Sequence, residues 1–230
     1  MSEIARFSDG LPGSDGEHEL QERYGTAKRA RGFYAKQMLG HLNAEMREFI
    51  ARQEMVFVST ADENGECDCS LRCGEPGFVR LLDSTHLVYP EYRGNGVMAS
   101  LGNISSNGHI GMFFADFFSS TVGLHVNGKA SAIENDELLS RDNLPKEVLA
   151  DLEVTGGRSP ERWVEVEVEE AYIHCSKHIP LLKKLDKDVD WGTDDEVKKG
   201  GDFFNAKNTS TPSKDDLGHA VGSAREKDNE

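Results

Sequence analysis

The chain has 230 residues, and its 41 acidic side chains against 26 basic ones give a formal net charge of −15. This acidic balance argues against non-specific binding to nucleic acid or to an anionic membrane, because both attract basic surfaces. No apolar run is long enough to span a bilayer and the first residues lack the pattern of a signal peptide, so we expect a cytoplasmic protein without a membrane partner.

The first 42 residues predict an N-terminal arm with short helices. Gly, Ser and Asp dominate residues 1–16, which we expect to be loose. Ser14 and Glu17 have the spacing of a capping box, which predicts a short helix ending near Tyr24. The basic stretch RYGTAKRARGFY, residues 23–34, is interpreted as a solvated surface turn rather than a functional patch.

Residues 43–180 predict one mainly β domain with flanking helices. Asn43 is a suitable N-cap for a first helix, whose apolar stripe includes Phe49 and Ile50. Asn64-Gly65 predicts a hairpin turn, and Asn127-Gly128 predicts a bulge or a sharp bend within a strand. Strand-like segments occupy residues 55–61, 67–73, 77–82, 86–90, 109–115, 121–133 and 163–174. Together with one central helix they favour a small closed antiparallel barrel with Greek-key-like connections.

A glycine-rich turn between a strand and the central helix is the best candidate for a ligand site. The turn, residues 92–96, follows a strand that ends at Pro90 and precedes an apolar repeat of helical spacing. Free N–H groups and the positive end of a helix dipole suit a phosphate group, although a tight turn also needs glycine for its geometry alone. Three nearby arginines add positive charge: Arg72, Arg80 and Arg93.

The four cysteines, Cys67, Cys69, Cys73 and Cys175, are expected to be free thiols in a reducing compartment. A zinc site that joined them to His174 is disfavoured, because the spacing matches no standard zinc motif. We therefore expect no metal. Further along, residues 181–205 predict a helical extension, with Thr193 and Glu196 spaced as a capping box, and residues 206–230 predict a disordered tail.

Four segments in this order resemble the pyridoxamine 5′-phosphate oxidase-like flavoproteins, the FMN-binding split-barrel family. They are SLRCGEPGFVRLLD, YPEYRGNGVMASLGNI, LHVNGKASAI and VEVEEAYIHCSK. The resemblance covers about residues 45–180, and residues 180–205 are similar to the ending of an actinobacterial-type branch. It implies an FMN-binding split β-barrel and a homodimer that holds FMN between its subunits.

The resemblance also implies which residues bind the cofactor. Arg72 falls where the family places an arginine on the FMN phosphate, and the turn 94–96 falls where the phosphate-binding turn opens the helix. Pro90 matches a strand-end position beside the flavin, while Phe78 and Val79 suit either the flavin or the core equally. The full expected set is Ser70, Arg72, Gly77, Phe78, Val79, Pro90, Gly94, Asn95, Gly96, Ser100, Asn103 and Lys177.

The expected function is that of an FMN-dependent oxidoreductase acting on an unidentified small molecule. The biosynthetic oxidases carry Ser-Arg-Lys in the phosphate turn and end in an arginine-bearing motif, whereas this chain has Gly94-Asn95-Gly96 and ends KDNE. Pyridoxamine phosphate is therefore not the expected substrate. His125 and His174 are candidate acid–base groups, but no catalytic residue is assigned. The alternatives are a non-catalytic flavin- or haem-binding module and a deazaflavin-dependent reductase.

Overall fold

The computed structural model describes residues 11–208. The chain divides into two compact units, Met1–Gly192 and Thr193–Glu230, and the sheet lies in the first. Residues 1–10 of the predicted loose arm and residues 209–230 of the predicted disordered tail lie outside the described residues. Ala206–Asn208, predicted as part of that tail, form a short 3₁₀ helix, η2.

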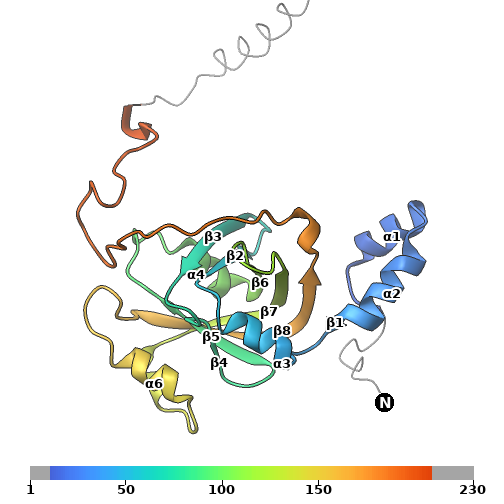
Figure 1. The fold of residues 1–230 in the computed structure, drawn as a ribbon, viewed down its shortest axis with the longest axis horizontal. Coiled ribbons are helices and arrows are strands. Elements are labelled where there is room, and N and C mark those ends of the chain that lie inside the picture. The colour runs from blue at the N-terminus through green and yellow to red at the C-terminus, as the bar shows by residue number, and fades with distance from the viewer. Residues whose placement is uncertain (1–10, 209–230) are drawn as a thin grey trace, which may run out of the picture. The chain divides into compact units, whose positions relative to one another are not determined.

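One antiparallel sheet of eight strands forms the body of the first unit (Figure 1). The hydrogen-bonded order is β3-β2-β6-β7-β8-β5-β4, and β1 pairs with β8 off this path. The strands are β1 Met38–Leu39, β2 Met55–Ala61, β3 Cys67–Cys73, β4 Arg80–Leu81, β5 His86–Glu91, β6 His109–Ala115, β7 Gly123–Ile133 and β8 Arg162–His174. This is the expected mainly β split barrel. The predicted closure is wrong, because β3 and β4 end the order instead of pairing with each other in the described chain.

Helices flank the sheet. They are α1 Asp15–Arg23, α2 Ala27–Gln37, α3 Ala44–Ile50, α4 Ala99–Ser106, α5 Asn135–Leu139 and α6 Lys146–Leu152, followed by the 3₁₀ helix η1 Ser176–His178. The predicted capping box is confirmed, since Ser14 and Glu17 exchange both hydrogen bonds. Asn43 Oδ1 likewise accepts the Met46 N–H at 2.9 Å. Within residues 11–208, every helix is too short or too polar to cross a membrane.

The alternation of apolar and polar residues along the strands determines which side chains form the core. In β8 the residues Val164, Val166 and Val168 are fully buried, as is the side chain of Phe114 in β6. A second, smaller cluster gathers Trp163 with apolar residues of β5, β7, α5 and α6. Burying these side chains is the main stabilising contribution to such a fold.

Two predicted segments take a different structure. The basic stretch 23–34, expected as a turn, is largely the helix α2, because Ala, Lys and Arg favour helix and Phe33 packs edge-on against Tyr172 at 5.8 Å. Residues 181–205, expected to be helical, form turns and irregular chain. There Val197 is 88% exposed, and a short helix whose apolar residue is not buried gains little stability.

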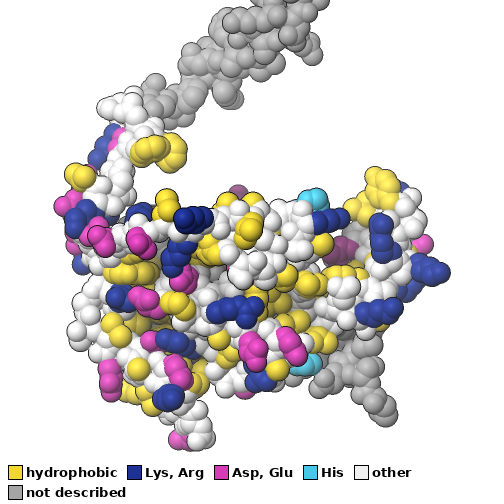
Figure 2. All heavy atoms as spheres, in the orientation of Figure 1, with side chains coloured by type: hydrophobic (Ala, Val, Ile, Leu, Met, Phe, Trp, Pro, Cys, Tyr) yellow, Lys and Arg dark blue, Asp and Glu magenta, His cyan; other side chains and the backbone are white. Residues whose placement is uncertain are grey.

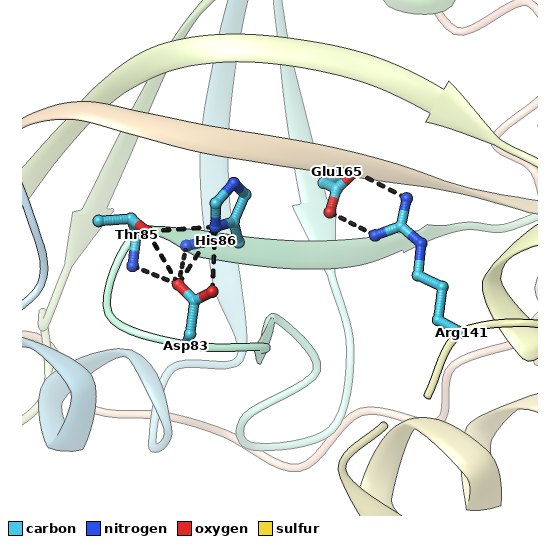
Figure 3. Close-up of polar contacts among 5 residues, drawn as sticks. All are labelled: Asp83, Thr85, His86, Arg141 and Glu165. Atoms are coloured by element: carbon cyan, nitrogen blue, oxygen red, sulfur yellow. Dashed lines mark hydrogen bonds and ion pairs between the residues drawn. The ribbon is translucent and has the colours of Figure 1, made fainter. Parts of the chain in front are cut away.

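The reversal between β4 and β5 is held by the carboxylate of Asp83. Its Oδ1 accepts the backbone N–H groups of Thr85 at 2.6 Å and His86 at 2.8 Å (Figure 3). Partial burial alone would raise the pKa of Asp83, but the hydrogen bonds from Thr85 and His86 lower it. Nearby, both terminal nitrogens of Arg141, which follows α5, bind the Glu165 carboxylate of β8 (Figure 3). That pair ties the flanking helices to the sheet.

Charges of both signs intermingle on the face drawn in Figure 2, instead of gathering by sign. Exposed ion pairs of the molecule include Arg23 with Glu19 and Arg158 with Glu75. Pairs at such exposed positions contribute about 0–1 kcal/mol each to stability.

Asp116, in the loop between β6 and β7, caps that loop as Asp83 caps its own. Its carboxylate accepts the N–H groups of Phe118, Ser119 and Ser120 at 2.8–2.9 Å and the Ser120 hydroxyl at 2.7 Å. Burial alone would raise the pKa of Asp116, but these hydrogen bonds outweigh it and lower the pKa from 3.8 to about 2.

We expect Asp116→Asn to lower the free energy of unfolding by about 1–3 kcal/mol at neutral pH, because Asn cannot accept all of these bonds. The folded-state pKa is depressed, so the stabilisation is complete above pH 3.8 and is lost as the pH falls towards 2. Urea unfolding of both proteins between pH 2 and 7 measures this. The exposed Asp142→Asn serves as control, and equal pH dependence of the wild type and Asp116→Asn would contradict the assignment.

Candidate functional site

A cavity of about 830 Å³ lies where β3, the end of β5 and the start of α4 meet. These segments are far apart in the sequence, and the curled sheet brings them to one place. The segment after η1 adds Trp191 to the wall. Six of the predicted cofactor residues line this cavity: Ser70, Arg72, Gly94, Asn95, Gly96 and Ser100.

The glycine turn leads directly into the N-terminus of α4. Gly96 has φ +81°, a conformation that favours glycine, and Met98 takes the N-cap position with φ +56°. The side chain of Met98 makes no capping hydrogen bond to the N–H groups in the first turn of α4. Asn95 stabilises the turn by accepting the Val97 N–H at 3.0 Å. The first turn of α4 therefore presents N–H donors and the positive end of a helix dipole to the cavity.

Hydroxyl groups from β3 and α4 meet on one carboxylate. Asp68 Oδ2 accepts hydrogen bonds from Ser70 at 3.3 Å and Ser100 at 3.2 Å, and the two hydroxyl oxygens lie 3.0 Å apart. Ser100 is only 4% exposed, so the network holds α4 against β3. Sequence reasoning found both serines but missed Asp68, although its position two residues before Ser70 puts it on the same face of the strand.

Arg72 also has an acidic partner. Its Nε donates to Glu91 Oε1 at 2.8 Å, and the two side chains are only 20% and 12% exposed. Glu91 was not predicted as a site residue. The cavity is lined by as many acidic as basic side chains, namely Asp68, Glu91 and Glu161 with Arg72, Arg93 and Arg162. It is therefore balanced in charge, not strongly basic.

The other predicted residues lie away from this lining. Phe78 and Val79 are 3% and 2% exposed and belong to the hydrophobic core. Gly77 has a structural role, because its φ is +78° and an added Cβ would lie 2.6 Å from the carbonyl oxygen of Ala51. The predicted strand 77–82 is shorter in the structure, where β4 comprises only Arg80–Leu81.

Three further predicted cofactor residues do not line the first cavity. Pro90 is buried and pairs with Trp163 of β8. Asn103 donates to Thr60 Oγ1 at 3.1 Å and so binds α4 to β2. Lys177 lies in η1, after the end of β8, and does not line the cavity.

A second hollow of about 540 Å³ shares Tyr92 and Trp191 with the first. The two rings meet edge to face, with their centres 5.1 Å apart. Arg80, expected to add charge to the phosphate turn, points here and binds both oxygens of Asp151 at 2.6 and 2.9 Å. Burial, and then the negative charge of Asp151, raises the pKa of Tyr92.

The two histidines considered as acid–base groups line a third hollow, of about 670 Å³. His125 Nε2 lies 3.0 Å from His174 Nδ1, and Phe113 contacts both rings at 4.9 Å. Burial, and then the charge of His174, lowers the pKa of His125. Cys69 lines this hollow, whereas its neighbours Asp68 and Ser70 line the first cavity, so the two spaces lie on opposite faces of β3.

The cysteines are free and exposed. Across residues 11–208, no group of three or more His, Cys, Asp or Glu side chains is arranged to hold a metal ion.

Comparison with known proteins identifies the family. The sequence model of the pyridoxamine 5′-phosphate oxidase family matches residues 42–175, more than half of the chain. The chain belongs to the pyridoxamine 5′-phosphate oxidase family. The match takes in the cavity residues from Asp68 to Arg162, whereas Lys177 and Trp191 follow it. A comparison with curated proteins gave no match.

Solved structures give distant similarities. A candidate pyridoxamine 5′-phosphate oxidase from Lactobacillus delbrueckii is 23% identical, with 59% of this chain and 98% of that chain covered and a TM-score of 0.43. HupZ of Group A Streptococcus is 22% identical, with coverage of 56% and 91% and a TM-score of 0.41. HutZ of Vibrio cholerae, described as a haem storage protein, is 13% identical, with coverage of 58% and 93% and a TM-score of 0.36. All three scores are below 0.5, so the family assignment stands on the sequence match.

Proposed function

We propose that this member of the pyridoxamine 5′-phosphate oxidase family is an FMN-binding oxidoreductase that acts on a small molecule, as a cytoplasmic homodimer. The observation that carries the proposal is the first cavity, where Arg72, the turn 94–96 and the start of α4 surround one space of about 830 Å³. Small-molecule sites usually have volumes of about 300–1,000 Å³. The turn lacks the Ser-Arg-Lys of the biosynthetic oxidases, so pyridoxamine phosphate is not the proposed substrate.

The residues that line the first cavity fit a ligand that carries a phosphate monoester and, next to it, a short chain with polar groups. Backbone N–H groups at residues 98–100 would bind phosphate oxygens, together with the terminal nitrogens of Arg72. Ser70 and Ser100 would offer hydroxyls beside them, and Trp191 an aromatic wall. FMN, when bound, supplies hydride or electron transfer at its ring system, while the protein supplies binding and orientation.

The homodimer in this proposal is supported by an apolar surface around the third hollow. Phe57, Phe113 and Phe117 line that hollow, and Leu71 and Phe118 nearby in the chain are 48% and 41% exposed. Exposed apolar groups in such number favour burial against another protein surface. A second copy that covered this surface would contact one face of β3, and the opposite face of that strand lines the first cavity.

Direct binding of FMN tests the function. The chain has two tryptophans, Trp163 fully buried and Trp191 at the cavity, so flavin binding is expected to quench the emission of Trp191. Titration of the full-length protein and of Trp191→Phe with FMN measures affinity, and screening of nicotinamide donors then tests reduction. A colourless, dialysed protein that fails to bind added FMN would contradict the proposal.

A haem-binding module is the second candidate, and one observation favours it. His125 and His174 present two imidazoles inside an apolar, aromatic hollow, and imidazole is a common haem ligand. Addition of haemin to the protein would then give a Soret band that His125→Ala and His174→Ala both weaken. A flavin spectrum without haem binding would favour the first candidate.

A further inference from the structure

Glu91 contacts Arg72 in a way that bears directly on anion binding. Arg72 lines the first cavity, and its Nε already donates a hydrogen bond to Glu91 Oε1 at 2.8 Å. Both side chains line the cavity and are mostly buried, at 20% and 12% exposure. An ion pair with so little solvent around it is screened far less than a surface pair.

The pair also joins strands that are not neighbours. Arg72 lies on β3, at one end of the sheet order, and Glu91 ends β5, next to the other end. Glu91 therefore reaches Arg72 across the opening of the split barrel, where the cavity lies. Any anion that enters between β3 and β5 meets a guanidinium whose charge is already balanced.

We propose that Glu91 acts as a built-in competitor for Arg72 and thereby sets the affinity and selectivity of the site for phosphate groups. A ligand phosphate must take over part of the bonding of Arg72, against the repulsion of the adjacent carboxylate. A dianionic phosphate ester can do this, whereas a neutral analogue gains nothing from Arg72. This inference rests on the proposed function, since the ligand is taken to be a phosphate ester such as FMN.

The test is the substitution Glu91→Gln, which keeps the size of the side chain and removes its charge. We expect it to tighten FMN binding about tenfold, the size of effect that one charge-assisted contact has. Binding of riboflavin, which lacks the phosphate, is expected to stay within about twofold. Arg72→Gln should abolish the gain, so that Glu91→Gln/Arg72→Gln binds FMN no better than Arg72→Gln.

The matched control is Glu161→Gln. Glu161 lines the same cavity but its carboxylate lies 3.8 Å from Arg162 instead of contacting Arg72. Both variants remove one negative charge from the same cavity. A gain in FMN affinity for Glu91→Gln alone would therefore show that Glu91 competes specifically for Arg72. Urea unfolding of each variant checks that the fold is kept.

The outcomes separate this inference from the proposed function. If FMN binds and Glu91→Gln weakens or does not change the affinity, Glu91 positions Arg72 and the competition is overturned. If FMN binds no variant, the proposed function fails, and protection against thermal unfolding by pyrophosphate then decides the competition. A gain in pyrophosphate affinity specific to Glu91→Gln supports it, and equal responses of all variants overturn it.

Discussion

Gly128→Ala is expected to lower the free energy of unfolding by about 3 kcal/mol, the largest stability effect of any single methyl group considered. Gly128 follows the register shift in β7, where an added Cβ would lie 2.0 Å from the carbonyl oxygen of Glu167 in β8. Real Cβ atoms do not come so close to backbone oxygens. The two central strands would have to move apart, which weakens their hydrogen bonds and exposes the adjacent core.

Denaturant unfolding of wild type and variant measures this loss. Gly32→Ala is the matched control, because Gly32 lies within α2 and an added Cβ would meet nothing within 4 Å. That control is expected to raise stability by about 0.5–1 kcal/mol, the helix propensity gained over glycine. A Gly128→Ala protein within 1 kcal/mol of the wild type would show that the bulge relaxes easily.

Arg72→Ala is expected to weaken FMN binding by about 1.5–3 kcal/mol, or roughly 10- to 150-fold. The change removes a guanidinium that lines the cavity and also leaves the Glu91 carboxylate there without this partner. Both effects act against an incoming phosphate, so the loss should fall towards the upper end of that range.

Flavin fluorescence or Trp191 emission, titrated at fixed ionic strength, measures the affinity. Arg23→Ala controls for net charge, since Arg23 is an exposed residue of α1 paired with Glu19. Riboflavin provides the control for the phosphate. Equal FMN affinities for the wild type and Arg72→Ala would remove Arg72 from the phosphate site.

Local signals in the sequence predicted much of this fold. Capping residues such as Ser14 and Asn43 act within one helical turn, so their partners are a few residues away in the chain. The valine alternation of β8 and the bulge at Asn127-Gly128 are likewise properties of one strand and its neighbours. The basic stretch 23–34 was missed as a helix because its charge was given more weight than its helix propensity.

The candidate site was only partly predictable, for a physical reason. The cavity depends on how far β3 and β5 curl towards each other, and neither strand carries a signal for that approach. Glu91 was therefore missed as the partner of Arg72, although both residues could be placed on strands. At Gly77 the resemblance predicts a cofactor residue, and the structure adds a backbone reason for glycine, its close approach to the carbonyl oxygen of Ala51.

The opening between β3 and β4 is expected to affect the rate at which a bound ligand exchanges. The described strands β3 and β4 share no ladder hydrogen bonds, and the ion pair of Arg72 with Glu91 links β3 to β5, the neighbour of β4. A ligand can thus enter or leave when side chains rearrange, while the hydrogen bonds between neighbouring strands from β3 to β4 stay intact. Exchange of a bound molecule should then be fast compared with global unfolding, and amide protons of the central strands β6, β7 and β8 should remain protected throughout.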